Sequence, residues 1–170
     1  MKLNGIQILA VILFLFSYPF ILCKKENFKQ VKSITCDNLI NDAFAAGDDY
    51  YIKIPTAFTP NGDGLNDRLA VFIKNISSAK LSIYDSRANL VFETADLTVQ
   101  WDPATESVMG KTYYYRIEAT SSNNKKLGLC GEIHPLKCVP KNNPSYYFQS
   151  QWNGNTFLIG IPSAEYNFCP

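Results

Sequence analysis

The feature of the sequence that most constrains its fold is a series of short segments in which apolar and polar residues alternate with a period of two. This alternation is typical of β-strands that bury one face. Phe and Tyr occur 11 and 10 times, and aromatic residues favour sheet over helix. Turn-forming residues separate the segments, which indicates an all-β fold of the sandwich type. The predicted strands are residues 51–58, 69–73, 80–85, 89–93, 112–119 and 126–133, with Ser121–Asn124 as the turn between the last two.

The first predicted strand contains a proline. Pro55 has no N–H to donate to a neighbouring strand, so we expect this strand to lie at a sheet edge or to contain a bulge.

Residues 1–23 have the composition of an export signal. Lys2 supplies a positive charge, and an almost wholly apolar run of about 17 residues extends from Ile6 to Leu22. An uncleaved anchor is the alternative, although the run is at the lower length limit for a spanning helix and contains Pro19. Cys23 ends the run, and we expect it to carry a lipid after signal cleavage, even though Leu22 is larger than the residue that normally precedes such a cysteine. The protein is then exported and lies at the outer membrane, in the periplasm or on the cell surface.

Residues 24–49 are polar and mixed, and they are expected to form a linker. Two alternatives remain for its second half. The stretch from Asp37 to Gly47 forms a short helix that Gly47 ends, or it is an extended tether between membrane and domain.

Four further cysteines form an even set in an exported chain, which predicts two disulfides. Three pairings are open. We expect Cys130 to pair with Cys169, which ties the C-terminal segment to the last strand, and Cys36 to pair with Cys138. Four reduced thiols are the alternative. Zinc is less favoured because no Cys-x-x-Cys pair exists and the lone His134 has no neighbour at ligand spacing.

The loop at residues 60–67 places four oxygen-bearing side chains within seven residues. Its glycines allow sharp turns, and hard cations such as Ca²⁺ take six to eight oxygen ligands, backbone carbonyls included. It lacks the distal glutamate of the helix–loop–helix calcium site. A plain rigid turn is the alternative, because Asn-Gly and Asp-Gly favour turns and Asx side chains bond to nearby backbone. The candidate ligands of a structural Ca²⁺ are Asn61, Asp63, Asn66, Asp67 and the carbonyl of Leu65.

Residues 139–170 carry a second hairpin signal. Asn153-Gly154 suits a two-residue turn between residues 146–152 and 155–161. A lone hairpin is marginal in water, so its aromatic side chains must pack on this domain or anchor a partner protein. The candidate partner-binding residues are Tyr146, Tyr147, Phe148, Trp152 and Phe157.

The sequence offers little support for catalysis. A single histidine leaves no relay of the Ser/His or Cys/His kind, and no glycine-rich phosphate loop lies between a strand and a helix. The formal net charge is only +1, so no long-range field favours nucleic acid as a partner. We therefore interpret the chain as non-enzymatic.

The opening motif is also recognisable. The segment Ile54–Asp67, Ile-Pro-Thr-Ala-Phe-Thr-Pro-Asn-Gly-Asp-Gly-Leu-Asn-Asp, closely resembles the start of the gliding-motility-associated C-terminal domain family of Bacteroidota. This resemblance implies an immunoglobulin-like β-sandwich over residues 50–138, here with an extra C-terminal β-hairpin. Domains of that family usually end large surface proteins and sort them for type IX secretion. The resemblance continues in register at residues 81–84, 90–94, 101–102, 110–111 and 113–117.

The chain departs from that family in ways that bear on function. Asp85-Ser86-Arg87-Ala88 stands where the family usually has Arg-Trp-Gly, so the tight turn must be remade. Residues 134–170 follow the expected last strand, and no cargo domain precedes the family segment. Two hypotheses follow. The first is a lipid-anchored accessory protein that docks on an envelope or outer-membrane complex, and the second is a carrier domain for type IX secretion.

Overall fold

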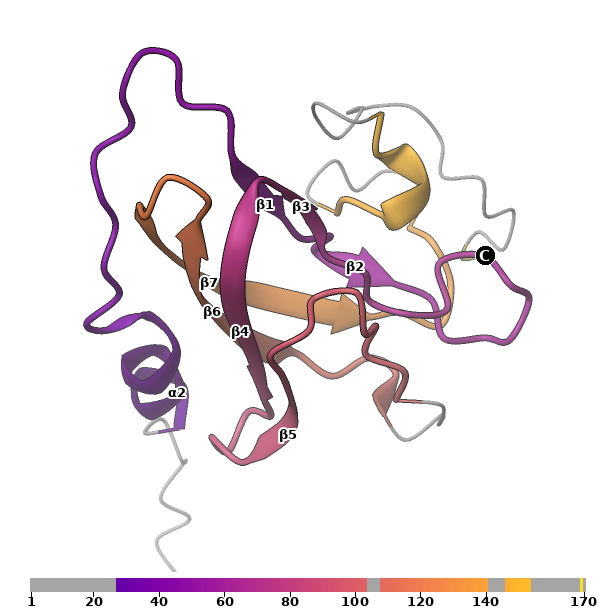
Figure 1. Ribbon diagram of the computed structural model, residues 1–170. Helices are drawn as coiled ribbons and strands as arrows, with labels where there is room; N and C mark the ends of the chain where they lie inside the picture. Colours follow the sequence, from indigo (N-terminus) through magenta and orange to yellow (C-terminus); the bar gives the residue numbers. More distant parts are fainter. Residues whose placement is uncertain (1–26, 104–107, 141–145, 154–168, 170) are drawn as a thin grey trace, which may run out of the picture.

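Two β-sheets face each other in the computed structural model, which describes residues 27–103, 108–140, 146–153 and 169 (Figure 1). The larger sheet has the strand order β2-β7-β6-β4-β5, and the smaller sheet pairs β1 with β3. This arrangement confirms the predicted immunoglobulin-like β-sandwich. The elements are α2 (Asn27–Cys36), β1 (Tyr51–Lys53), β2 (Ala57–Phe58), β3 (Phe72–Lys74), β4 (Ile76–Tyr84), β5 (Leu90–Thr94), β6 (Tyr113–Ser121), β7 (Lys126–Pro135) and the 3₁₀-helix η2 (Gln149–Gln151).

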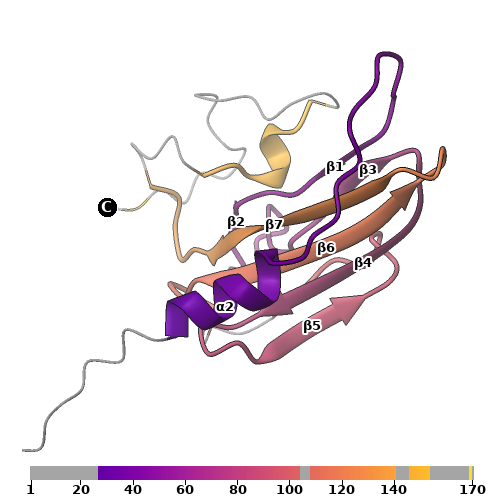
Figure 2. The same ribbon diagram turned by 90° about the vertical axis from the view of Figure 1, so that its left-hand side faces the viewer.

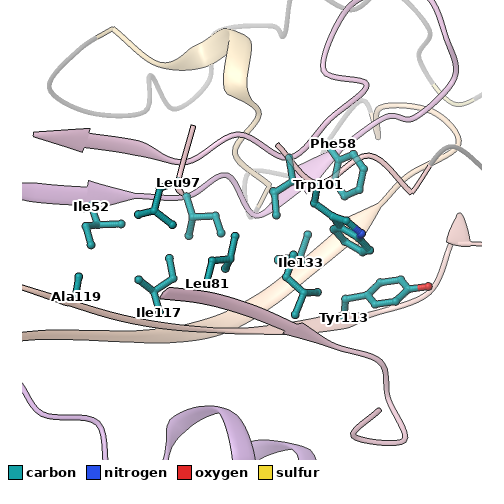
Figure 3. Close-up of a cluster of buried hydrophobic side chains, with 12 residues drawn as sticks. Ile52, Phe58, Leu81, Leu97, Trp101, Tyr113, Ile117, Ala119 and Ile133 are labelled. Carbon is teal, nitrogen blue, oxygen red and sulfur yellow. The ribbon is translucent and has the colours of Figure 1, made fainter. Parts of the chain in front are cut away.

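The core fills the space between the two sheets (Figure 3). Leu81 on β4 lies opposite Ile117 on β6, and both side chains are fully buried. The period-two alternation of these strands therefore points one row of side chains inward, as the sequence predicts. Trp101 closes one end of the core, with its ring 5.5 Å from that of Phe58 and 5.0 Å from that of Tyr113.

The predicted strand 51–58 is wrong as a single element, because the chain changes sheets within it. β1 pairs antiparallel with β3, whereas β2 pairs in parallel with the end of β7. Pro55 is buried at the crossing. Since its nitrogen cannot donate, a continuous ladder would be interrupted there in either sheet.

Helix α2 lies against the outer face of the large sheet, on the side away from the core (Figure 2). It contacts β6 and β7 and occupies residues that the sequence predicts to be linker. Val31 and Thr35, one helical turn apart, are both buried, so this stripe faces the sheet. The predicted helix from Asp37 to Gly47 does not form. Those residues run on without helical structure, and Gly47 instead adopts φ +96° in a turn. No helix in the described ranges is long and apolar enough to cross a membrane.

The first half of the predicted C-terminal hairpin is not a strand. Residues 146–148 are irregular and η2 follows, while the predicted second half, 155–161, lies outside the described residues. The Gln151 side chain accepts a hydrogen bond from the Phe148 amide at 2.8 Å. This contact and the 3.0 Å bond from the Gln151 amide to the Phe148 carbonyl fold the chain into a turn where an extended strand was expected.

The β4–β5 turn is remade without the glycine that the family usually has. Asp85 organises it: one carboxylate oxygen accepts hydrogen bonds from the amides of Arg87 and Asn89 at 2.8 and 2.9 Å. Burial raises the pKa of Asp85, but these bonds and that from the Asn89 side chain outweigh burial and hold the pKa below its ordinary value. Ala88 takes φ +65°, a left-handed conformation that side chains with a Cβ rarely adopt.

We expect Ala88→Gly to stabilise the protein by about 0.5–1 kcal/mol, because glycine removes the Cβ conflict and gives back part of the gain through its flexible unfolded state. Urea titration measures the change in the free energy of unfolding. Ser86→Gly is the control, because Ser86 has no positive φ, and it should lower stability slightly. An Ala88→Gly variant no more stable than wild type would contradict this account of the turn.

Candidate functional site

The loop that carries the family motif stands at one end of the sandwich. Its base is closed by the Thr59 amide, which donates to the Asn66 carbonyl at 2.8 Å. Gly62 and Gly64 adopt φ +84° and +88°, so the sharp turns need residues without a Cβ. The residues from Asn61 to Leu65 are exposed, whereas Asn66 is buried.

Both carboxylates of this loop accept hydrogen bonds from within it. The two oxygens of Asp67 accept from the amides of Gly62 and Gly64 at 2.6 and 2.7 Å. Asp63 accepts from the Leu65 amide at 2.8 Å and from the Asn61 side chain at 3.1 Å. Charged acceptors form stronger hydrogen bonds than neutral ones, so the loop is rigid by its own bonding.

The remaining candidate calcium ligands are also engaged. The Asn61 side-chain oxygen accepts from the Asp63 amide at 2.9 Å, and the Leu65 carbonyl accepts from the Thr59 hydroxyl at 3.4 Å. The Asn66 side-chain oxygen accepts from the Ser150 amide at 3.0 Å, which links the loop to η2. Within the described residues, no three His, Cys, Asp or Glu side chains gather as a metal site. Calcium binding by this loop stays a prediction.

The loop borders an open hollow of about 940 Å³. Arg68 and Asp102, which form an ion pair at 2.8 Å, line this hollow together with Lys137 and Gln149. Leu65 is 39% exposed beside them. A rigid rim with one exposed apolar side chain and mixed charges suits contact with another macromolecule better than capture of a small molecule.

The described members of the predicted partner-binding set pack on their own domain. Phe148 is 3% exposed, in a second apolar cluster with Ala57 and Val139. Trp152 stacks on Phe72 of β3, with ring centroids 5.1 Å apart. Tyr146 lies over the ring of His134 at 5.1 Å, and the Tyr147 carbonyl accepts from the amides of Thr56 and Ala57 at 3.0 and 3.2 Å. Phe157 lies outside the described residues.

Two disulfides form, as predicted, but the expected pairing is wrong. Cys36 pairs with Cys130, and Cys138 pairs with Cys169, with Cα–Cα distances of 5.3 and 5.0 Å. Cys130 belongs to the outward-facing row of β7, so it faces α2 across the sheet surface. The first bond therefore ties the N-terminal segment to the domain, and the second closes the C-terminal segment on itself.

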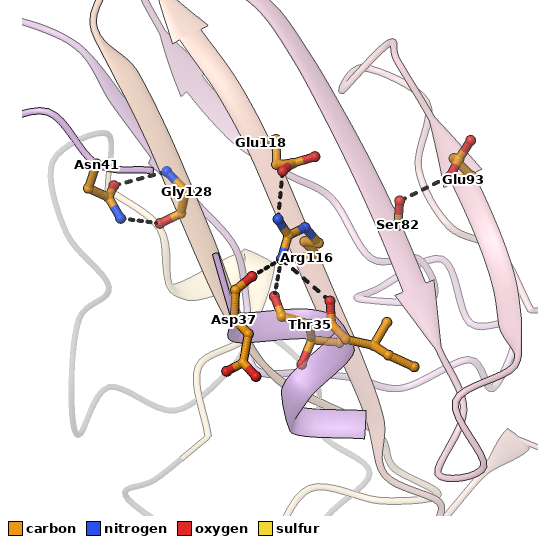
Figure 4. Close-up of polar contacts among 9 residues, drawn as sticks. Thr35, Asp37, Asn41, Ser82, Glu93, Arg116, Glu118 and Gly128 are labelled. Atoms are coloured by element: carbon orange, nitrogen blue, oxygen red, sulfur yellow. Dashed lines mark hydrogen bonds and ion pairs between the residues drawn. The ribbon is translucent and has the colours of Figure 1, made fainter. Parts of the chain in front are cut away.

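Sequence reasoning missed the contacts of Arg116, which stands on the outer face of β6 (Figure 4). Its Nη1 donates to the carbonyls of Ile34, Thr35 and Asp37 at 3.4, 3.3 and 2.8 Å, and its Nη2 donates to Glu118 at 2.6 Å. A cation at the C-terminal end of a helix satisfies carbonyls that have no partner within the helix. The sequence signal for these contacts was a charged residue, Arg116, within a strand otherwise rich in aromatic residues.

His134, the lone histidine, packs against Tyr146 and lies beside Glu132. Burial lowers its pKa below the ordinary value of 6.5, and the opposing effect of Glu132, 3.6 Å away, does not cancel it. The imidazole is therefore neutral at pH 7, packed against Tyr146.

These features define a small β-sandwich domain with a hydrogen-bonded motif loop and a closing segment on each side. Residues 52–130 match the family model described as the CHU_C Type IX secretion signal domain, so this part of the chain is similar to that family. The match confirms the resemblance found in the sequence and assigns the protein to the exported proteins of the cell envelope or surface. No curated protein and no solved structure matches the chain.

We expect Asp67→Ala to lower the free energy of unfolding by about 1–3 kcal/mol, because two backbone amides lose a charged acceptor. Thermal or urea unfolding checks the value. Asp49→Ala is the matched control, because this exposed carboxylate forms only a surface ion pair with Lys74, which should contribute about 0–1 kcal/mol. Equal effects of the two changes would show that the Asp67 bonds do not hold the loop.

Proposed function

We propose that this protein is a non-catalytic envelope protein that uses its secretion-signal-type domain as a docking module on a larger surface, secretion or gliding complex. A lipid on Cys23 holds it to the membrane. The observation that carries this proposal is the packing of the C-terminal segment on its own domain. Phe148 is buried there, and the Tyr147 carbonyl accepts hydrogen bonds from the amides of Thr56 and Ala57.

A carrier role is the second candidate, and the family match favours it. A secretion apparatus that recognises the free C-terminal end of such a domain would find that end covered by other residues here. Val139, Tyr147 and Phe148 pack against β2, and Cys138 is covalently bonded to Cys169. The motif loop and its hollow stay open, so they are the surface we assign to docking.

Fusion to an export-competent reporter separates the two roles. Residues 27–138 and residues 27–170 are each fused to its C-terminus, so that Cys36 can pair with Cys130, with Cys138→Ser in the shorter form to avoid an unpaired thiol. Docking predicts that neither fusion delivers the reporter to the cell surface. Delivery by either one supports the carrier role.

Deletion of residues 140–170, again with Cys138→Ser, tests the packing of the C-terminal segment. We expect loss of cooperative folding, because the cluster of Ala57, Val139 and Phe148 loses its largest member. Circular dichroism and recovery of partners from detergent-solubilised membranes are measured together. The Cys138→Ser/Cys169→Ser protein is the control for the lost disulfide. A folded deletion variant that no longer recovers a partner would show that the segment is itself the docking surface.

Lipidation of Cys23 is tested by metabolic labelling with a fatty-acid analogue. We expect label on the wild type and none on Cys23→Ser, with the Cys36→Ser variant labelled like the wild type. Label that persists in Cys23→Ser would remove the lipid anchor from the proposal.

Structural calcium in the motif loop is tested by thermal unfolding with and without millimolar Ca²⁺. Two carboxylates imply a weak site, of the order of 10⁻⁴–10⁻³ M. We expect Ca²⁺ to raise the midpoint of the wild type and to leave Asp63→Ala unchanged. Identical midpoints in both buffers for both proteins would leave a hydrogen-bonded turn only.

A further inference from the structure

Over its first half, the outer edge of β7 is paired by a segment that is not a strand, through three side-chain hydrogen bonds and one backbone hydrogen bond. We name residues 37–42 the strap. Asn41 donates from its side chain to the Gly128 carbonyl at 3.0 Å and accepts from the Gly128 amide at 2.9 Å. Asp42 accepts from the Lys126 amide at 2.6 Å, and its own amide donates to the Lys126 carbonyl at 3.0 Å. The strap thus supplies the four hydrogen bonds that a neighbouring strand would make, and Figure 4 shows the two between Asn41 and Gly128.

Gly128 is the residue that lets the strap lie so close. A Cβ at this position would stand 2.7 Å from the Leu39 Cβ and 3.2 Å from the Ile40 carbonyl oxygen. Gly128 has no positive φ, so its backbone does not require glycine. The absence of a side chain serves contact with the strap instead.

The strap buries little apolar surface of its own. Ile40 and Phe44, in and just beyond it, are 67% and 68% exposed. Its hydrogen bonds at Lys126 are exposed to water, and segments of this kind open readily. What holds the strap in register lies just before it: the Cys36–Cys130 bond, with the Arg116 guanidinium on the carbonyls at the end of α2.

We propose that the strap is an oxidation-controlled closure of the β7 edge, locked by the Cys36–Cys130 disulfide. With both thiols reduced, α2 and the strap detach and the edge at Lys126 and Gly128 opens to solvent. With the disulfide formed, the edge is closed. The device goes beyond the docking role, and it makes the closed fold dependent on arrival in an oxidising compartment.

The locking step is a thiol–disulfide exchange with a disulfide-bearing oxidant. One of the two cysteines, as thiolate, attacks a sulfur of the oxidant, forms a mixed disulfide and releases one thiol. The other cysteine, as thiolate, then attacks its partner's sulfur in the mixed disulfide, forms the Cys36–Cys130 bond and releases the second thiol. Two electrons pass to the oxidant, and the two protons lost by the cysteines balance the two thiols formed.

Residue-resolved hydrogen exchange by NMR tests the lock on the folded, exported chain. The comparison is between wild type and Cys36→Ser/Cys130→Ser, with Cys138→Ser/Cys169→Ser as the matched control. We expect the double serine variant to lose protection at the amides of Asp42, Lys126 and Gly128 while the β4–β6 amides stay protected. The control should keep the strap protected.

Two outcomes would overturn the proposal. Equal strap protection in wild type and Cys36→Ser/Cys130→Ser would show that the disulfide does not hold the strap. Loss of protection throughout β4 and β6 would show that the disulfide holds the whole fold rather than a separate closure.

Gly128→Ala gives a second test that keeps all cysteines. The new Cβ should push the strap away, so the Asp42 amide loses protection and formation of the Cys36–Cys130 bond slows. The same change in the Cys36→Ser/Cys130→Ser background should leave the unfolding midpoint unchanged or raise it, since alanine suits a strand better than glycine. Retained Asp42 protection in Gly128→Ala would contradict the close contact.

Discussion

The structure depends on hydrogen-bond partners for the backbone amides and carbonyls at one sheet edge. A strand with only one paired neighbour presents a row of amides and carbonyls that must find partners or water. The first half of β7 is in this position, because only β6 pairs with it there. This half is paired by Asn41 and Asp42, and the second half by β2, where the His134 amide donates to the Thr56 carbonyl at 2.9 Å. β2 has an edge of its own, which the Tyr147 carbonyl covers. The matched domain is therefore closed by segments that lie on both sides of it in the sequence.

The two disulfides stand where these closing segments leave the sandwich. They span 94 and 31 residues, and in the chain-entropy account loops of these lengths contribute about 5 and about 4 kcal/mol. Neither closing segment has a large apolar core. The N-terminal one places Val31 and Thr35 on the sheet, and the C-terminal one places Phe148 beside Ala57 and Val139. Covalent ties offset the entropy of ordering segments with so few buried contacts.

The sequence predicts the central strands well because their burial is local in origin. In β4, β6 and β7 the alternating residues reach the core through the pleat alone, and the Ser121–Asn124 turn forms as expected. The motif loop can also be predicted from the sequence, since the hydrogen bonds within it join residues no more than seven apart. Ala88 is a further local case. The sequence shows that the glycine of this turn is missing, and the consequence is a positive φ at Ala88 in the same turn.

The rest depends on partners that are distant in sequence. Alternation places Cys130 on the outer face of β7, but it does not reveal that α2 lies on that face. The predicted disulfide pairing is therefore wrong. Local signals leave a short helix or an extended tether open at Asp37–Gly47, whereas packing on β6 and β7 favours a helix at residues 27–36. The C-terminal segment reads as a hairpin from Asn153-Gly154, yet Gln151 and the edge of β2 give its backbone other partners.

Peptide mapping of the non-reduced protein tests the central claim, that each closing segment has its own covalent tie. Trypsin separates all four cysteines, because Lys32, Lys53, Lys126, Lys137 and Lys141 place them in peptides 33–53, 127–137, 138–141 and 142–170. The structure predicts that 33–53 is linked to 127–137 and that 138–141 is linked to 142–170. A link between 33–53 and 138–141, or between 127–137 and 142–170, would contradict it.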